Sequence, residues 1–138
     1  MIEKLHVAHP KTPAQVAADL CEAAARMTER GFAKFNRHAD EDTVERGYAE
    51  HLGAVCLIGA FEPYRDMWAE LRCPQALNAL ATFLHDTLFS YKEKKSSLSG
   101  AVHRIVIWNN APERTKEDAI QALLTTAEKV EAGILSVL

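Results

Sequence analysis

The spacing of apolar residues predicts mostly helices, and the first lies between Thr12 and Gly31. Thr12 can cap its N-terminus, Pro13 suits the first helical position, and Gln15 completes a capping box. Gly31 follows as a natural stop. Between these ends, apolar side chains recur at steps of four and three, as on one face of a helix. They are Val16, Leu20, Ala24 and Met27.

A second helix is expected from about residue 43 to residue 61. Its later part, residues 52–60, is apolar on nearly every face, which is typical of the central buried helix of a domain. Pro63 interrupts the pattern, and a short third helix is expected after it. The apolar positions of this third helix are Tyr64, Met67, Trp68 and Leu71.

Two further helices are predicted in the second half of the chain. Pro74 can open the fourth, which fades near Tyr91, and residues 92–102 are expected to form a solvated loop. Thr115 can cap the last helix, and acidic side chains in its first turn suit the helix dipole. The two apolar faces are formed by Leu77, Leu80, Ala81, Leu84 and Leu88, and by Ile120, Leu123, Leu124, Ala127 and Val130.

Residues 103–108 read His-Arg-Ile-Val-Ile-Trp, and this short β-branched stretch predicts a strand. Residues 32–37 are its candidate partner in a hairpin, and residues 109–112 have the composition of a turn. The predicted fold is therefore mainly α: a compact single-domain bundle of about five helices with at most one small β-hairpin. It would span residues 1–138, with residues 1–11 as an N-terminal extension.

The composition fits a small globular domain. The 138 residues are 48% hydrophobic and 25% charged, which excludes a disordered tail, a collagen-like chain and a disulfide miniprotein. A net charge of -3 gives no strong attraction to nucleic acid. Three cysteines without C-x-x-C spacing favour reduced thiols in the cytoplasm. The most apolar stretch, residues 53–61, is shorter than the roughly 20 residues of a membrane span, so no membrane association is expected.

Two sequence motifs resemble those of a known family. Residues 56–60 read Cys-Leu-Ile-Gly-Ala, and residues 108–115 read Trp-Asn-Asn-Ala-Pro-Glu-Arg-Thr. These stretches resemble the C-x-x-G-A and W-N-D-x-P-x-R-T motifs of an uncharacterised small-domain family of bacteria and their phages. The step from Gly31 to Phe32 is similar to the family's G-W, and Asn110 stands where the family has Asp. The resemblance implies one domain of bacterial or phage origin and no particular reaction.

The stretch from residue 108 to residue 115 has a structural and a functional interpretation. Trp108 would anchor its segment in the core, the two asparagines would turn the chain, and Thr115 would cap the next helix. The same stretch could present a recognition surface, because Trp and Arg are enriched at interface hot spots. The structural role is favoured, and the two roles are compatible. The candidate binding residues are Trp108, Asn109, Asn110 and Arg114.

A metal-dependent enzyme is the alternative. His85 and Asp86 follow an apolar helical run and resemble the His-Asp pair of HD-domain phosphohydrolases. In that family a His from an earlier helix and an Asp from a later one complete a divalent metal site, and His51 and Asp118 match those positions here. Such ligands suit Mn, Fe or Mg, which could activate a water for attack on phosphorus. The residues after Asp86 depart from that family's usual continuation, and an exposed His-Asp pair is the simpler interpretation.

A thiol mechanism is a further alternative. It would use Cys56 as nucleophile, His103 as base and Asn109 as the orienting group, an order that resembles papain-like enzymes. A buried Cys that acts as a small hydrophobe is the commoner case. The basic cluster of the predicted loop contains Glu93 among serines, which indicates a solvated surface. Its lysines are Lys92, Lys94 and Lys95.

These observations favour a binding module over an enzyme. The sequence contains no convincing catalytic set, and neither a metal nor a cofactor is expected. The expected protein is a cytoplasmic accessory or regulatory protein that acts through contact with an unidentified protein partner. A homodimer is a further alternative, in which the third predicted helix would supply the contact face. The apolar residues of this contact face would be Tyr64, Met67 and Trp68.

Overall fold

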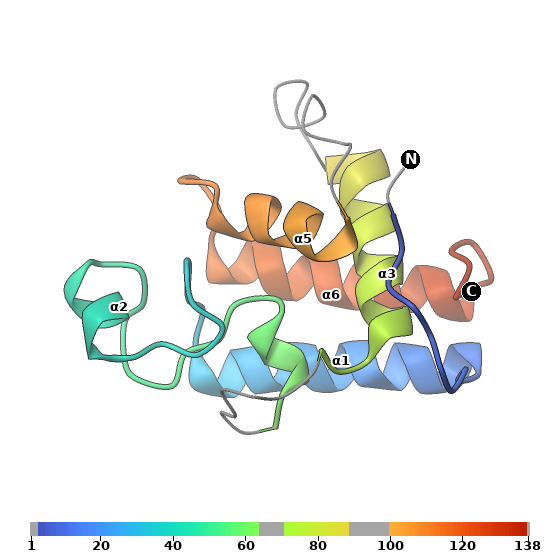
Figure 1. Cartoon of the computed structure of the whole chain (residues 1–138), viewed down its shortest axis with the longest axis horizontal. Coiled ribbons are helices and arrows are strands. Elements are labelled where there is room, and N and C mark those ends of the chain that lie inside the picture. The colour runs from blue at the N-terminus through green and yellow to red at the C-terminus, as the bar shows by residue number, and fades with distance from the viewer. Residues whose placement is uncertain (1–2, 64–70, 89–99, 138) are drawn as a thin grey trace.

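The computed structural model describes residues 3–63, 71–88 and 100–137, and this part of the chain is mainly helical (Figure 1). The described residues contain five α-helices and four isolated β-bridges but no strand, so the predicted mainly α fold is confirmed. A 3₁₀ turn, Gly59–Phe61, and a π-helical turn, Leu84–Leu88, complete the helical elements. The α-helices are α1 (Pro13–Arg30), α2 (Glu41–Glu45), α3 (Pro74–Phe83), α5 (Ala101–Asn110) and α6 (Lys116–Glu131).

The first and last helices form the base of the fold. α1 and α6 pack against each other along their length, and the chain runs along them in opposite directions (Figure 1). α1 begins with the predicted capping box of Thr12 and Gln15, and α6 begins with the predicted Thr115 cap, which Asp118 completes to a second capping box. α3 packs on both helices of this pair, and α5 packs on α3. The core between the helices includes Leu20, Met27, Leu77, Ile105 and Leu123, all fully buried.

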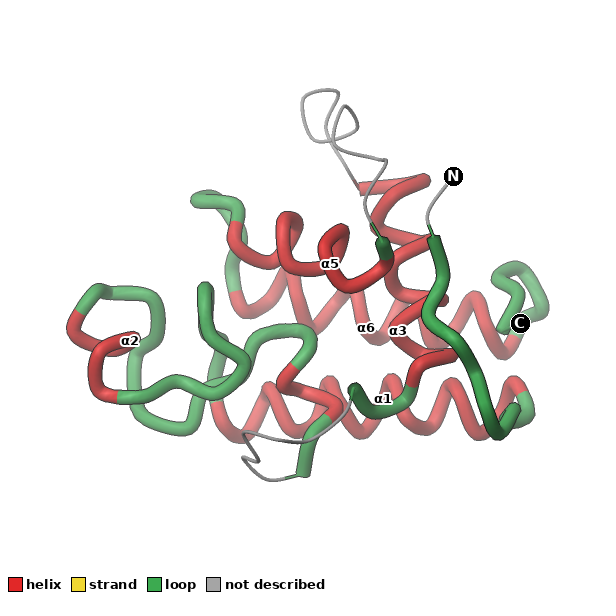
Figure 2. Tube along the Cα trace, in the orientation of Figure 1, coloured by secondary structure: helices red, strands yellow, loops and turns green. Residues whose placement is uncertain are grey.

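The helix predicted over residues 43–61 is wrong. α2 covers Glu41–Glu45 only, and Figure 2 shows mostly loop between α1 and α3. Gly47 and Gly53 have φ values of 80° and 82°, which interrupt a right-handed helix. Residues 54–61 are nevertheless buried, and an irregular segment accounts for their apolar character as well as a helix would. This segment bonds to the chain after α1, for example from the Val55 N–H to the Gly31 carbonyl at 2.9 Å.

The predicted strand over residues 103–108 is also wrong, because these residues belong to α5. Ala101, Ile105 and Trp108 are buried at helical spacing, and this face outweighs the β-branched composition. The predicted partner segment, residues 32–37, bridges instead to residues 49 and 55. Ala101 and Val102, the end of the predicted solvated loop, already lie in α5.

Several predictions fall on residues outside the described ranges. These are most of the third helix with Tyr64, Met67 and Trp68, the end of the fourth helix, and the lysines at positions 92, 94 and 95. The N-terminal extension lies along α3, where Asn78 exchanges two hydrogen bonds with the backbone of Leu5. No helix within the described ranges is long and apolar enough to cross a membrane.

Candidate functional site

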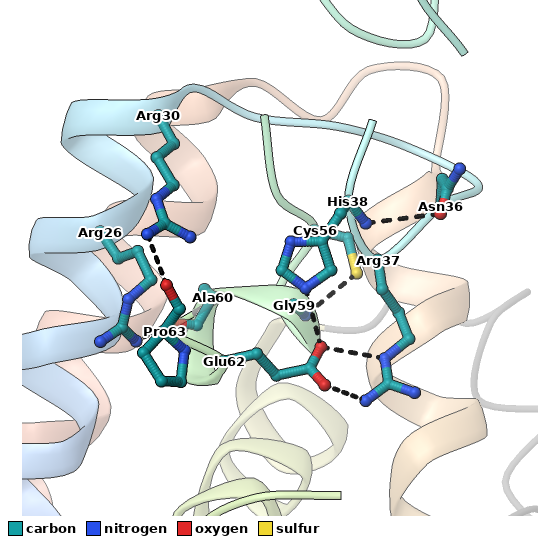
Figure 3. Close-up of polar contacts among 10 residues, drawn as sticks. All are labelled: Arg26, Arg30, Asn36, Arg37, His38, Cys56, Gly59, Ala60, Glu62 and Pro63. Atoms are coloured by element: carbon teal, nitrogen blue, oxygen red, sulfur yellow. Dashed lines mark hydrogen bonds and ion pairs between the residues drawn. The ribbon is translucent and has the colours of Figure 1, made fainter. Parts of the chain in front are cut away.

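A carboxylate, a guanidinium and an imidazole meet in the loop region between α1 and α3 (Figure 3). The Glu62 side chain is buried, with 2% of its surface exposed. Its Oε1 accepts a hydrogen bond from Arg37 Nε at 3.0 Å, and its Oε2 accepts another from Arg37 Nη2. His38 Nε2 lies 3.2 Å from Oε1. The two parallel bonds fix the plane of the Arg37 guanidinium.

The imidazole of His38 is neutral near pH 7. Burial lowers the pKa of His38, and the positive charges of Arg30 and Arg37 act in the same direction, while the hydrogen bond with Glu62 opposes them. Because Glu62 is ion-paired with Arg37, it acts as the acceptor, so Nε2 of His38 carries the proton. The cluster therefore holds one positive and one negative charge, paired with each other.

Gly59 allows the chain to form this cluster. A Cβ atom at Gly59 would lie 1.9 Å from the Arg37 carbonyl oxygen, so no other residue fits without displacing that backbone. The Cys56 carbonyl accepts the Ala60 N–H at 2.8 Å, and the turn directs the following Glu62 toward Arg37. The Cys-Leu-Ile-Gly-Ala stretch thus has a structural role: it brings two segments into direct contact beside the ion pair.

Cys56 is buried and serves as part of this turn. Its Sγ accepts a hydrogen bond from the Gly59 N–H at 3.5 Å, and burial raises the pKa of the Cys56 thiol. Asn109 lines the same cavity as Cys56, whereas His103 is exposed on α5. A thiol that is held protonated and lacks its expected base is not an activated nucleophile.

The stretch from Trp108 to Thr115 joins α5 to α6 and binds the segment after α1. Asn109 is 1% exposed, and its side chain accepts the Leu57 N–H at 2.9 Å and donates to the Ala33 carbonyl at 3.0 Å. Asn109 therefore satisfies backbone groups of two loops that have no helix or sheet partner there.

Trp108 and Arg114 form a second contact at the same turn. Trp108 is 2% exposed, and the Arg114 guanidinium lies over its ring, 4.1 Å from the centroid. Arg114 Nε also donates to the Trp108 carbonyl at 2.9 Å. Of the predicted binding residues, Asn110 and Arg114 keep part of their surface exposed, while Trp108 and Asn109 act from inside the fold. Their role in binding stays a prediction.

The turn also positions an exposed aromatic residue. Asn110 Oδ1 accepts the Phe35 N–H at 2.9 Å, and Lys34 Nζ donates to the Ala111 carbonyl at 2.8 Å. Phe35 has a φ of 65°, a left-handed conformation that is costly for a bulky residue. Its side chain is 61% exposed, and its ring lies 4.6 Å from that of Tyr48. The fold thus holds an aromatic pair at the surface at some energetic cost.

A cavity of about 330 Å³ opens beside this pair, between the loop region and α5. Its walls are mostly apolar, and Arg37 and three asparagine side chains supply polar groups. A larger and more open hollow of about 710 Å³ lies on the other side of His38, toward α1. The ion-pair cluster therefore stands between two concave regions.

The predicted metal ligands are not brought together. His51, His85, Asp86 and Asp118 all belong to the described residues, and these contain no group of three or more His, Cys, Asp and Glu side chains placed to hold a metal ion. His51 Nε2 instead donates to the Arg30 carbonyl at 2.7 Å, and Asp118 completes the capping box of α6. The HD-like arrangement is not formed.

Sequence reasoning missed Arg37, His38 and Glu62, which the fold brings into one cluster, and the exposed Phe35. A usable signal was present for Phe35, because this aromatic residue stands among Lys34, Asn36 and Arg37 in a segment without helical periodicity. No such signal marks Glu62, which lies 25 residues from Arg37 and is buried only through long-range contacts.

The fold and the cluster together define a small mainly α domain whose loop region is organised around an ion pair between the buried Glu62 and the partly exposed Arg37. Over residues 11–129 the chain matches the group described as "Family of unknown function (DUF6197)", and it belongs to that family. This agrees with the expected membership of an uncharacterised family. That the two motifs are characteristic of this family stays a prediction. No curated protein and no solved structure matches the chain.

Proposed function

We propose that the protein is a binding module that acts through protein–protein contact, with Phe35 and Tyr48 at the centre of its contact surface. The observation that carries the proposal is the exposed, left-handed Phe35. Backbone strain of this kind costs about 1–3 kcal/mol and persists where the surrounding structure enforces it, which is commonly at functional sites. An apolar ring that the fold holds at the surface in such a conformation is better explained by a binding partner than by a contribution to stability.

The surroundings of the aromatic pair support this assignment. Aromatic side chains bury large areas with few rotatable bonds, so they contribute strongly at the centre of interfaces. Asn110 and Arg114, the partly exposed members of the predicted binding set, lie on the turn that holds Phe35. The predicted recognition surface and the aromatic pair are therefore neighbouring parts of one face.

The setting we propose is the cytoplasm of a bacterium or of a phage-infected cell, in an accessory or regulatory role. The free thiols of Cys21, Cys56 and Cys73 support a reducing compartment. The two motifs support the bacterial or phage origin, as the resemblance implies.

Quantitative affinity capture tests the proposal. The full chain and its Phe35→Ser variant are used as baits in lysate of the native cells, and the captured proteins are compared by mass spectrometry. Leu124→Ser, which changes an exposed apolar residue of α6 (37% exposed), is the matched control. We expect one partner to be lost with Phe35→Ser and retained with Leu124→Ser. Equal capture by all three baits would contradict the proposal, and a captured second copy of this chain would identify the contact as a homodimer.

A further inference from the structure

The cavity beside α5 has a single charged lining residue among the residues the structure describes, and this residue is Arg37. Its Nε and one N–H of Nη2 are engaged by Glu62. The remaining guanidinium N–H groups have no protein acceptor in the described part of the chain. A guanidinium whose plane is fixed on one edge and whose other edge is unengaged suits a planar anionic group.

The rest of the cavity is suited to an apolar body. Ile58 and Leu71 come from the loop region, and Val102 and Val106 come from one face of α5. The volume of about 330 Å³ is at the lower end of the range for small-molecule sites, and mostly apolar walls with a few polar groups are typical of such sites. Glu62 lies behind the guanidinium and does not line the cavity, so no carboxylate within the described ranges lines this space.

We propose that this cavity binds a small carboxylic acid with an apolar body, such as a medium-chain fatty acid. The carboxylate accepts hydrogen bonds from Arg37, and the hydrocarbon lies against Val102 and Val106. The buried Glu62 is a positioning residue that orients the guanidinium. This site adjoins the proposed protein contact, because Phe35 and Asn110 line the cavity, but its anion-binding group is Arg37 and its apolar wall is on α5.

Isothermal titration calorimetry of the full chain with octanoate tests the assignment, with phenylpropionate as a second acid of different shape. Octanol and octylamine have the same chain with a neutral or a positive head group, so they separate the charge from the hydrocarbon. We expect saturable binding of at least one acid, roughly ten-fold tighter than the alcohol and the amine, since charge-assisted hydrogen bonds are stronger than neutral ones.

Two variants locate the site. Val106→Phe fills the cavity and should abolish binding, while His103→Phe adds the same ring on the exposed face of α5 and should leave binding unchanged. Arg37→Lys keeps a positive charge for Glu62 but replaces the planar fork of the guanidinium by a single ammonium group, which cannot hold Glu62 on one edge and the acid on the other, so it should weaken acid binding roughly ten-fold. Circular dichroism confirms that each variant is folded.

The following results would overturn the assignment. One is that neither acid binds saturably in the millimolar range. Another is that octylamine binds as tightly as octanoate. A third is that the Val106→Phe variant binds octanoate as tightly as the unmodified chain. Val106 and His103 are not part of the aromatic pair. If acid binding is not observed, the affinity-capture test of the protein contact therefore still stands by itself.

Discussion

The side-chain oxygen of Asn110 accepts the backbone N–H of Phe35 at 2.9 Å, across a separation of 75 residues in the sequence. The same oxygen accepts a hydrogen bond from Asn109 Nδ2 at 3.0 Å. The turn between α5 and α6 thereby controls the conformation of a residue on a distant loop. The structural and functional interpretations of this turn are therefore compatible, because its contacts within the fold hold an aromatic ring at the surface.

Substitution of Asn110 tests this relationship. Both hydrogen bonds end on Oδ1, and the structure gives Nδ2 no partner among the described residues, so a carboxylate can take over both. Asn110→Asp, which introduces the residue that the resembled family has at this position, should leave the free energy of unfolding nearly unchanged. Asn110→Ala should lower it by about 1–2 kcal/mol, because two donors lose their acceptor. Urea denaturation of the three proteins measures the difference.

Equal destabilisation by Asn110→Asp and Asn110→Ala would contradict this account. It would mean that the amide group of Asn110 is required, and that Oδ1 alone does not hold Phe35.

Gly59 should tolerate no side chain. Gly59→Ala places a Cβ atom against the Arg37 carbonyl and should lower the free energy of unfolding by about 1–3 kcal/mol through displacement of the backbone. Gly100→Ala is the matched control, because a Cβ there meets its nearest atom at an ordinary 3.7 Å. Thermal unfolding of the two variants should differ clearly. A Gly59→Ala protein as stable as the control would show that this contact is not tight.

The sequence predicted the parts of the fold that local chemistry determines. α1 and α6 begin with capping boxes and have clear apolar faces, so both could be located from the sequence. The irregular structure of residues 54–61 could not be predicted, because a buried irregular segment and a buried helix have the same apolar pattern. The difference depends on hydrogen bonds to residues 31–39, which no local pattern reveals. α5 was mistaken for a strand because its β-branched residues obscured a helical period.

Prediction of the site is limited in the same way, because only features with a local sequence pattern can be recognised before the chain is folded. The turn at residues 108–115 was recognised because its asparagine, proline and threonine residues have local meanings. The pairing of Glu62 with Arg37 and His38 depends on two loops that come together only in the folded chain. Charged residues spaced along loops give no periodic signal that would distinguish a buried carboxylate from a solvated one.

The stability of the protein should depend on the protonation of His38. The folded pKa of His38 lies below the 6.5 of an unperturbed imidazole, mainly because of burial. Below pH 6.5 the unfolded chain therefore binds more protons than the folded chain, and the free energy of unfolding falls as the pH decreases through this window. His38→Gln keeps a donor for Glu62 and removes the titration, so it should flatten this part of the profile.

The control for this measurement is His103→Gln, since His103 is exposed on α5. The midpoint of urea unfolding of the His103→Gln variant should change with pH between 4.5 and 7 in the same way as that of the unmodified protein. A His38→Gln profile as steep as the control would show that His38 does not contribute to the pH dependence.

The three cysteines should differ in reactivity. Burial raises the pKa of the Cys56 thiol, and it raises the pKa of Cys73 to about 11, while Cys21 is exposed on α1. Since the thiolate is the reactive form, one thiol should react quickly with a disulfide reagent at pH 8 in the native protein, and Cys21→Ser should remove this phase. Rapid modification of Cys56 would contradict its assignment as a structural residue and would revive a thiol mechanism.

The most direct test of the account is photo-crosslinking from position 35. The photoreactive amino acid p-benzoyl-phenylalanine replaces Phe35 in one protein and Leu124 in a control, and both are irradiated in the native cells. We predict a crosslinked species from position 35 that contains this chain and one defined protein partner, and no such species from position 124. If position 35 yields no crosslink, or the same products as position 124, the proposed contact surface is wrong.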